Sequence, residues 1–190
     1  MILGVLSDTH GHENIAATAV SVLKLAGAQA FVHCGDVGGE EVLDLFAGLQ
    51  TWFVWGNCDD ASPFSSNYAR SLGLNSPNGV PLCISLAGRT IAVFHGHEAL
   101  FARISQRIQE GRLDDAATLV QNADYVLSGH THQRHDVRVG TMRFINPGAL
   151  HRAHIHSVAT IDLREDVVRY WRVDADMNAE DPPLIELPPP

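Results

Sequence analysis

The first third of the chain alternates short apolar runs with segments of helical periodicity. Residues 2–6 form a compact apolar run, and apolar side chains then recur every three or four positions over residues 13–26, which predicts a strand followed by a helix. The pattern repeats, with predicted strands at 30–33 and 52–55 on either side of a short predicted helix at 40–49. This strand-helix alternation is typical of a parallel sheet covered by helices.

The remainder of the chain has fewer helices and more closely spaced strands. Residues 60–81 are dense in proline, asparagine, serine and glycine, which predicts a long surface loop. Helical spacing returns at 100–108 and 113–120, and strands are predicted at 82–86, 90–94, 125–127, 136–139, 142–145, 157–163 and 167–173. We therefore expect a single domain over residues 1–173. Residues 174–190 are acidic, contain five prolines and are predicted to form a C-terminal tail outside the core.

Composition narrows the classes of partner. The 190 residues suit one domain, and 22 acidic against 13 basic residues give a net charge of −9. This balance argues against a nucleic-acid polymer as partner, because binding a phosphate backbone needs a dense positive surface. No run approaches the ~18 apolar residues of a membrane span, and the first residues lack a signal-peptide pattern, so we expect a cytoplasmic protein with no membrane partner.

Three cysteines, Cys34, Cys58 and Cys83, are widely spaced and odd in number. Such a set makes a poor disulfide framework and fits a reducing compartment. We expect all three to be small buried residues.

Residue types that bind metals follow five of the predicted strands. The segments are Asp8-Thr9-His10, Gly35-Asp36, Gly56-Asn57-Cys58-Asp59, His95-Gly96-His97 and Gly129-His130-Thr131-His132. Each has an ordinary explanation by itself, as a helix cap, a turn or a surface histidine. Their joint occurrence at strand ends instead predicts a cluster at one sheet edge. Carboxylate, amide and imidazole groups suit divalent ions such as Mn²⁺, Fe²⁺, Zn²⁺ or Co²⁺, and seven candidate ligands suit two ions.

The order of these segments resembles the motifs of the calcineurin-like metallophosphoesterase superfamily. Within it, the chain is most similar to a small bacterial and archaeal phosphodiesterase group related to the retromer subunit of the same fold. The resemblance covers about residues 1–173 and includes Asn146-Pro147-Gly148. It implies an α/β fold, a four-layer α/β/β/α sandwich of two mixed β-sheets flanked by helices, and an enzyme that hydrolyses phosphodiesters.

The resemblance also implies how two divalent ions would share the ligands. One ion would be held by Asp8, His10, Asp36 and His132, and the other by Asp36, Asn57, His95 and His130. A hydroxide between the ions would attack phosphorus in line while the ions neutralise the phosphate oxygens. Manganese is the expected metal, with iron, zinc, cobalt, nickel and magnesium as alternatives.

One position departs from the larger superfamily. Many members have a histidine after the Gly-Asn pair that contacts substrate and assists the leaving group, whereas this chain has Cys58. Because a thiol is a poor general acid for an alkoxide, we expect a preference for good leaving groups or help from His97 or His12. Asp36, Asn57 and His97 are the residues that we expect to act in catalysis.

Three function classes stay open at this point. The favoured one is a metal-dependent phosphodiesterase acting on a small phosphoester; the others are a phosphomonoesterase on the same site and a non-catalytic interaction scaffold of the same fold. All seven ligand positions keep ligand-competent side chains, which favours an enzyme. The sequence does not decide whether the chain forms a homodimer, nor whether histidines near Arg152 reach the mouth of the site: His151, His154 and His156.

Overall fold

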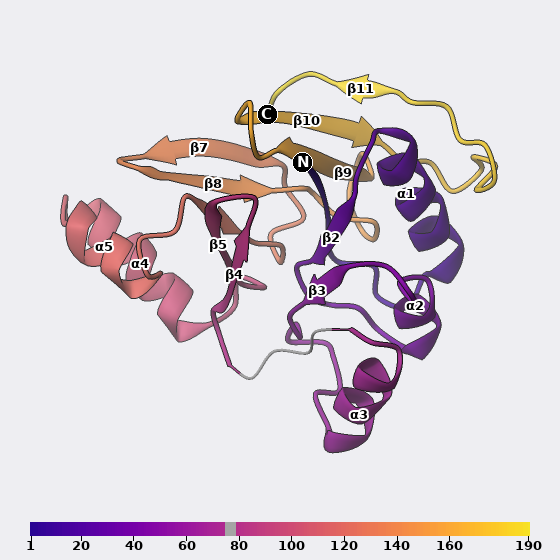
Figure 1. Ribbon diagram of the computed structural model, residues 1–190, viewed down its shortest axis with the longest axis horizontal. Helices are drawn as coiled ribbons and strands as arrows, with labels where there is room; N and C mark the ends of the chain where they lie inside the picture. Colours follow the sequence, from indigo (N-terminus) through magenta and orange to yellow (C-terminus); the bar gives the residue numbers. More distant parts are fainter. Residues whose placement is uncertain (75–78) are drawn as a thin grey trace.

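Two β-sheets pack face to face and carry helices on their outer faces in the computed structural model (Figure 1). The structure describes residues 1–74 and 79–190. Its strands are β1 (Ile2–Leu6), β2 (Ala30–His33), β3 (Thr51–Phe53), β4 (Leu82–Leu86), β5 (Arg89–Val93), β6 (Tyr125–Leu127), β7 (His135–Val139), β8 (Met142–Asn146), β9 (Ser157–Asp162), β10 (Val167–Arg172) and β11 (Glu186–Leu187). Its helices are α1 (Glu13–Leu25), α2 (Glu40–Asp44), α3 (Pro63–Ser71), α4 (Ala99–Gln109) and α5 (Leu113–Leu119). Within these described residues, none of the helices is long and apolar enough to cross a membrane.

Each sheet mixes parallel and antiparallel strands. The first has the order β11-β10-β9-β1-β2-β3, in which β1, β2 and β3 are parallel and the other three pair in antiparallel fashion. The second has the order β4-β5-β6-β8-β7, with β5, β6 and β8 parallel and an antiparallel strand at each edge. The parallel start and the antiparallel finish confirm the fold class predicted from the sequence.

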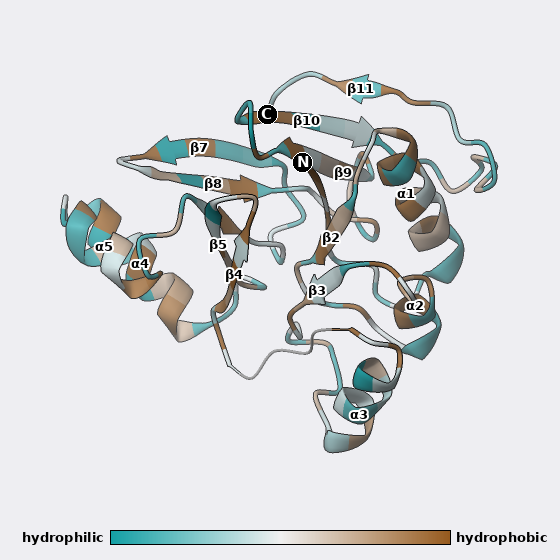
Figure 2. Ribbon diagram, in the orientation of Figure 1, coloured by the Kyte–Doolittle hydropathy of each residue, from teal (hydrophilic) through white to brown (hydrophobic). Residues whose placement is uncertain are grey.

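Alternating side chains of the strands fill three separate apolar layers. Leu3 and Val5 of β1 lie between the sheets, where Ile91 and Val93 of β5 meet them from the opposite side. Ala92, between those two residues, packs instead in the layer beneath α4 and α5. A third layer lies between the first sheet and the helices α1 and α2. Figure 2 shows the hydrophobic residues of the central strands that form these layers. Three apolar layers between four layers of secondary structure make the predicted sandwich.

The prediction of a continuous loop over residues 60–81 is wrong, because α3 lies within it. The hydroxyl of Ser62 accepts a backbone N–H from the first helical turn, and Pro63 occupies a position where its missing N–H costs nothing. Ala69 is fully buried against the layer under the helices. The turn-forming residues therefore start a helix; the part of the predicted loop at 75–78 lies outside the described residues. The helix predicted at 40–49 also ends earlier, at Asp44, where turns begin.

The C-terminal segment returns to the sheet. Residues 174–190 were expected to form a tail outside the core, yet β11 pairs antiparallel with β10, placing Leu187 opposite Tyr170. Leu187 packs against the apolar layer between the two sheets. The end of the chain therefore covers an exposed sheet edge, as Figure 1 shows.

Candidate metal centre

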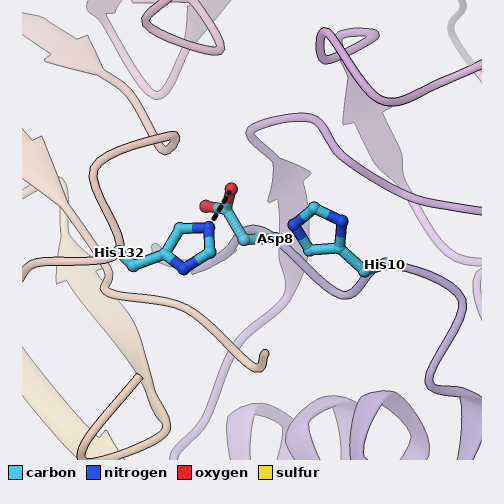
Figure 3. Close-up of side chains that lie close together, drawn as sticks. All are labelled: Asp8, His10 and His132. Atoms are coloured by element: carbon cyan, nitrogen blue, oxygen red, sulfur yellow. Dashed lines mark ion pairs between the residues drawn. The ribbon is translucent and has the colours of Figure 1, made fainter. Parts of the chain in front are cut away.

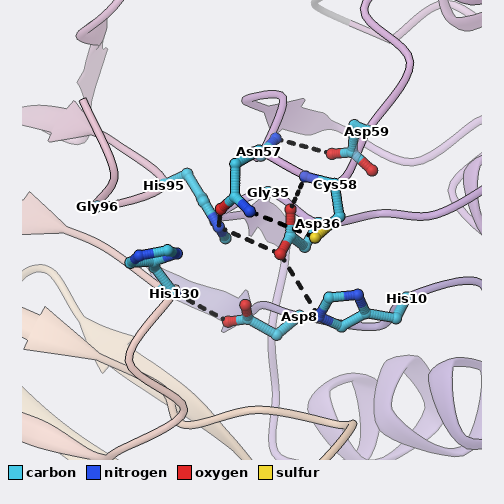
Figure 4. A network of polar contacts seen from close by, with 12 residues as sticks. Asp8, His10, Gly35, Asp36, Asn57, Cys58, Asp59, His95, Gly96 and His130 are labelled. Atoms are coloured by element: carbon cyan, nitrogen blue, oxygen red, sulfur yellow. Dashed lines mark hydrogen bonds and ion pairs between the residues drawn. The ribbon is translucent and has the colours of Figure 1, made fainter.

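The loops that follow β1, β2, β3, β5 and β6 converge at one edge of the sandwich and carry all seven candidate ligands, which are labelled in Figures 3 and 4. The first sheet supplies ligands after β1, β2 and β3, and the second sheet supplies them after β5 and β6. In that order they are Asp8 and His10, Asp36, Asn57, His95, and His130 with His132. The candidate site therefore forms where the two sheets meet, and each sheet contributes part of it.

The carboxylates of Asp8 and Asp36 each belong to two groups of ligand atoms that lie within 4.8 Å of one another. The groups are Asp8 with His10 and His132 (Figure 3), Asp8 with Asp36 and His95, and Asp36 with His10 and Cys58. His130 is outside these groups, although its ring centroid lies 5.0 Å from that of His95. Shared carboxylates of this kind suit adjoining metal positions.

Candidate ligand atoms of three side chains face one another around His95. Its Nδ1 lies 2.8 Å from the carbonyl oxygen of Cys34, which can only accept, so Nδ1 carries a proton and Nε2 is the nitrogen available to a metal ion. That Nε2 lies 3.1 Å from Oδ1 of Asn57 and 3.3 Å from Oδ2 of Asp36. A metal ion among these atoms would take the place of a proton on Nε2 and bind all three. A backbone carbonyl that fixes the other ring nitrogen is also a common feature of histidines that bind metals.

Two buried ligand atoms lack a hydrogen bond within the described part of the chain: Oδ1 of Asp8 and Nε2 of His10. His132 Nε2 lies 3.3 Å from the first, and Oδ2 of Asp36 lies 3.4 Å from the second, without hydrogen-bond geometry. A buried polar atom left unsatisfied costs roughly 1–3 kcal/mol. The donor set and these unsatisfied atoms together fit divalent metal ions.

The backbone is strained at most of the candidate ligands. Five of the seven adopt left-handed conformations: Asp8 (φ 56°), His10 (φ 47°), Asp36 (φ 53°), His130 (φ 67°) and His132 (φ 57°). This region is rare for residues other than glycine and costs about 1–2 kcal/mol per residue. Such strain concentrates at functional sites, where it orients side chains that ordinary loop geometry would turn away.

The two shared carboxylates differ in their electrostatic surroundings. Burial would raise the pKa of Asp36, but the backbone N–H of Cys58, 2.9 Å from Oδ1, and the imidazoles of His95 and His10 outweigh burial and lower this pKa. Burial dominates at Asp8 and raises its pKa. A bound cation would remove the cost of keeping Asp8 charged.

Two further acidic residues hold the ligand loops in place, and sequence reasoning did not assign them a role. Asp59 accepts three backbone N–H groups at 2.8–3.1 Å, those of Val37, Gly38 and Gly56, and so joins the loops after β2 and β3. Glu98 accepts the N–H groups of His95 and Gly96, both at 2.7 Å. The available signal was their position, with Asp59 at the end of one candidate ligand segment and Glu98 just after another.

The buried His33 connects the loops after β1 and β2. Its Nδ1 accepts the N–H of Gly35 at 3.2 Å, so Nε2 carries the proton and donates to the Thr9 hydroxyl at 2.9 Å. Thr9 in turn donates to the carbonyl of Val37 at 2.9 Å. Burial lowers the pKa of His33 to about 3, so the ring stays neutral. The sequence marked His33 only as the last residue of a strand.

Cys58 and His97 both lie at the exposed mouth of the site. Partial desolvation and the carboxylate of Asp36 raise the pKa of the Cys58 thiol. The prediction that all three cysteines are buried holds for Cys34 but is wrong for the exposed Cys58 and the half-buried Cys83. The ring of His97 is exposed, and its centroid lies 5.4 Å from that of His95.

One histidine of the later cluster reaches the site. The ring centroid of His151 lies 5.0 Å from that of His10, and the ring stacks on His12 at 4.5 Å. His156 joins His12 and His151 around a cavity of about 560 Å³, whereas His154 is exposed and does not line it.

The sequence resembles known phosphoesterases over most of its length. A model described as the calcineurin-like phosphoesterase superfamily domain matches residues 1–166. A phosphodiesterase of Methanocaldococcus jannaschii is 26% identical over 176 residues, which are 90% of this chain and 97% of that protein.

Solved structures share the fold at lower identity. A novel archaeal phosphodiesterase superposes with a TM-score of 0.75 at 21% identity, covering 90% of this chain and 99% of that one. The phosphoesterase YfcE from E. coli gives 0.59 at 20% identity, with 98% of each chain covered. A double mutant of Vps29 from Entamoeba histolytica gives 0.62 at 21% identity, with 99% of this chain and 100% of that one covered.

Proposed function

The chain belongs to the calcineurin-like phosphoesterase superfamily, and we propose that it hydrolyses phosphodiesters with the help of two divalent metal ions. The convergence of His95 Nε2 with the side-chain oxygens of Asp36 and Asn57 is the observation that carries this proposal. The unsatisfied buried ligand atoms and the strained ligand backbone support it. The similarity to a phosphodiesterase of M. jannaschii favours diesters as the substrate class.

The proposed ligands divide into two sets that share Asp36. One set is Asp8, His10, Asp36 and His132, and the other is Asp36, Asn57, His95 and His130. When bound, such ions would lower the pKa of a water molecule and neutralise charge on the phosphate oxygens. We propose manganese, with iron, zinc, cobalt, nickel or magnesium as alternatives, because oxygen and imidazole donors accept all of them.

Hydrolysis requires a P–O bond to form and another to break. Hydroxide derived from water would bond to phosphorus, and the ester oxygen on the opposite side would leave as an alcohol after gaining a proton. His97 is the exposed imidazole beside His95 and is the proposed donor of that proton. Asp36 contributes through its fixed position, because the Cys58 N–H holds Oδ1 and directs Oδ2 toward His10 and His95.

Metal removal followed by reloading tests this function. After chelation, hydrolysis of bis(p-nitrophenyl) phosphate should be lost and should return with Mn²⁺, and it should exceed hydrolysis of p-nitrophenyl phosphate. The Asp44→Asn variant, in which an exposed aspartate of α2 changes, should behave as wild type. Faster monoester hydrolysis would identify a phosphomonoesterase. Inactivity toward both esters with metal bound would favour a non-catalytic scaffold.

A further inference from the structure

An apolar groove of about 460 Å³ runs between α4 and the β7–β8 hairpin, beside the candidate metal centre. Five apolar side chains from these three elements line it: Phe101, Ile108, Val137, Val139 and Phe144. Figure 2 shows hydrophobic residues on α4, β7 and β8. Val137 is 43% exposed, so part of this apolar surface faces solvent.

The groove begins at the loops that carry the candidate ligands. Gly96, Gly129 and Thr131 line its inner end, and each is the chain neighbour of a candidate ligand histidine. A phosphate held at the metal centre would therefore have one of its ester oxygens near this end of the groove. The groove therefore borders the proposed catalytic site.

Several polar side chains that line the groove form hydrogen bonds within the protein. The amide of Asn146 donates to the carbonyl of Gly129 at 2.8 Å and to the hydroxyl of Thr131 at 3.1 Å. Ser105 donates to a backbone carbonyl of its own helix, and Arg134 donates to the carbonyl of Pro188. The groove therefore offers a ligand mainly apolar contact, with Arg134 as its permanently charged lining side chain.

We propose that this groove binds an aromatic or other bulky apolar ester group of the substrate, so that the enzyme selects phosphodiesters that carry one. The inference rests on the proposed function and adds a substrate class to it. A volume of about 460 Å³ lies in the range of small-molecule pockets, which are mostly apolar with a few polar groups at the edge. A stable protein partner would need roughly 800 Å² on each side, far more than five side chains provide.

Two phosphonates test the groove without any need for turnover, because their C–P bond is not an ester. Calorimetric titration of the Mn²⁺-loaded protein should show phenylphosphonate binding about tenfold more tightly than methylphosphonate, as burial of a ring predicts. Val137→Asp places a charge in the groove and should weaken phenylphosphonate about tenfold while leaving methylphosphonate unchanged. Val167→Asp changes a similarly exposed valine (37%) on β10 and should affect neither ligand.

Equal affinities for the two phosphonates in wild type would overturn the groove as a subsite. So would unchanged phenylphosphonate binding in Val137→Asp, or equal weakening of both ligands. Hydrolysis of bis(p-nitrophenyl) phosphate, measured in parallel, reports separately on the proposed function. If the phosphonates show no selectivity but hydrolysis is intact, the groove proposal is wrong and the phosphodiesterase proposal is unaffected. If phenylphosphonate binds selectively but no diester is hydrolysed, only the catalytic proposal is wrong.

Discussion

Two clusters of charged side chains lie at opposite ends of β6 and are built in opposite ways. At its start, Arg143 donates to both carboxylate oxygens of Asp136 at 2.7 and 2.8 Å and to Asp166 at 2.8 Å. The hydroxyl of Tyr125 also donates to Asp166 at 2.8 Å. At the other end, in the candidate metal centre, Nε2 of His95 faces the side-chain oxygens of Asn57 and Asp36, as Figure 4 shows.

The difference separates a structural ion cluster from a ligand site. In the Arg143 cluster, the protein supplies the donors that its carboxylates need, so nothing further has to bind there. In the candidate metal centre, Oδ1 of Asp8 and Nε2 of His10 have no hydrogen bond, and the backbone of most candidate ligands is strained. Charge and burial alone do not distinguish the two clusters, but the pairing of hydrogen-bond donors with acceptors does.

The largest expected effect comes from Asp36→Asn, which keeps size and removes the charge that both proposed ions share. We expect loss of at least one ion and a fall in kcat/KM of about a thousandfold or more, because metal catalysis supplies several kcal/mol. The free energy of unfolding of the metal-free protein should fall slightly, because the lowered pKa of Asp36 means that its charged form is favoured in the folded state. Metal analysis, kinetics and chemical denaturation check these outcomes beside Asp44→Asn. A variant with two ions and the wild-type rate would rule out the assignment of Asp36.

The next effect concerns protonation of the leaving group. With Cys58 in place of an acid, hydrolysis of aryl diesters should greatly outpace that of alkyl diesters, and Cys58→His should narrow the gap. His97→Ala should slow alkyl diesters much more than activated aryl diesters. General acids contribute about 10²–10⁴-fold, so the slope of log rate against leaving-group pKa resolves these cases. A flat wild-type slope with rate-limiting chemistry would show that an efficient acid is already present.

Thr9→Val should weaken metal binding about 10–100-fold, because it removes the hydroxyl that joins His33 to the loop after β2. Thr9→Ser keeps the hydroxyl and should restore affinity. Titration with Mn²⁺ under identical conditions measures both variants. Equal affinity in Thr9→Val and wild type would contradict a positioning role for the His33–Thr9 connection.

In contrast to Thr9→Val, Arg143→Leu should affect the stability of the fold and not metal binding. It leaves Asp136 and Asp166 without their main partner and should lower the free energy of unfolding by about 1–3 kcal/mol. Metal affinity and kcat/KM measured below the unfolding transition should stay within about twofold of wild type. A large loss of metal affinity in this variant would show that the two clusters are coupled.

The smallest effect is a pH dependence of the same structural cluster. Burial alone would raise the pKa of Asp166, but hydrogen bonds from Tyr125 and two arginines lower it to about 2. The folded-state pKa lies below the unfolded value, so this stability is present above about pH 4 and is lost as the pH falls toward 2. We expect a loss on the order of 1 kcal/mol that is reduced in Asp166→Asn. Identical acid denaturation profiles for wild type and Asp166→Asn would contradict this expectation.

The sequence predicts which residues follow the strands but not which of these residues contact one another. The βαβαβ start predicted that the loops after β1, β2 and β3 would share an edge, since apolar runs and helical spacing are local signals. The His33–Thr9 connection was invisible because it depends on a register across two strands. The Arg143 cluster joins residues as far apart as Asp136 and Asp166, which no local pattern links. The helix α3 was missed because serine and proline favour both turns and helix starts.

The most direct test of the central claim is calorimetric titration of the metal-free protein with Mn²⁺, combined with metal analysis after desalting. We predict two ions bound per chain in wild type and in Arg143→Leu, a higher unfolding temperature for each with metal, and fewer ions in Asp36→Asn. Absence of binding in wild type, or binding that Asp36→Asn leaves unchanged, would contradict the account that the converging side chains form a metal centre.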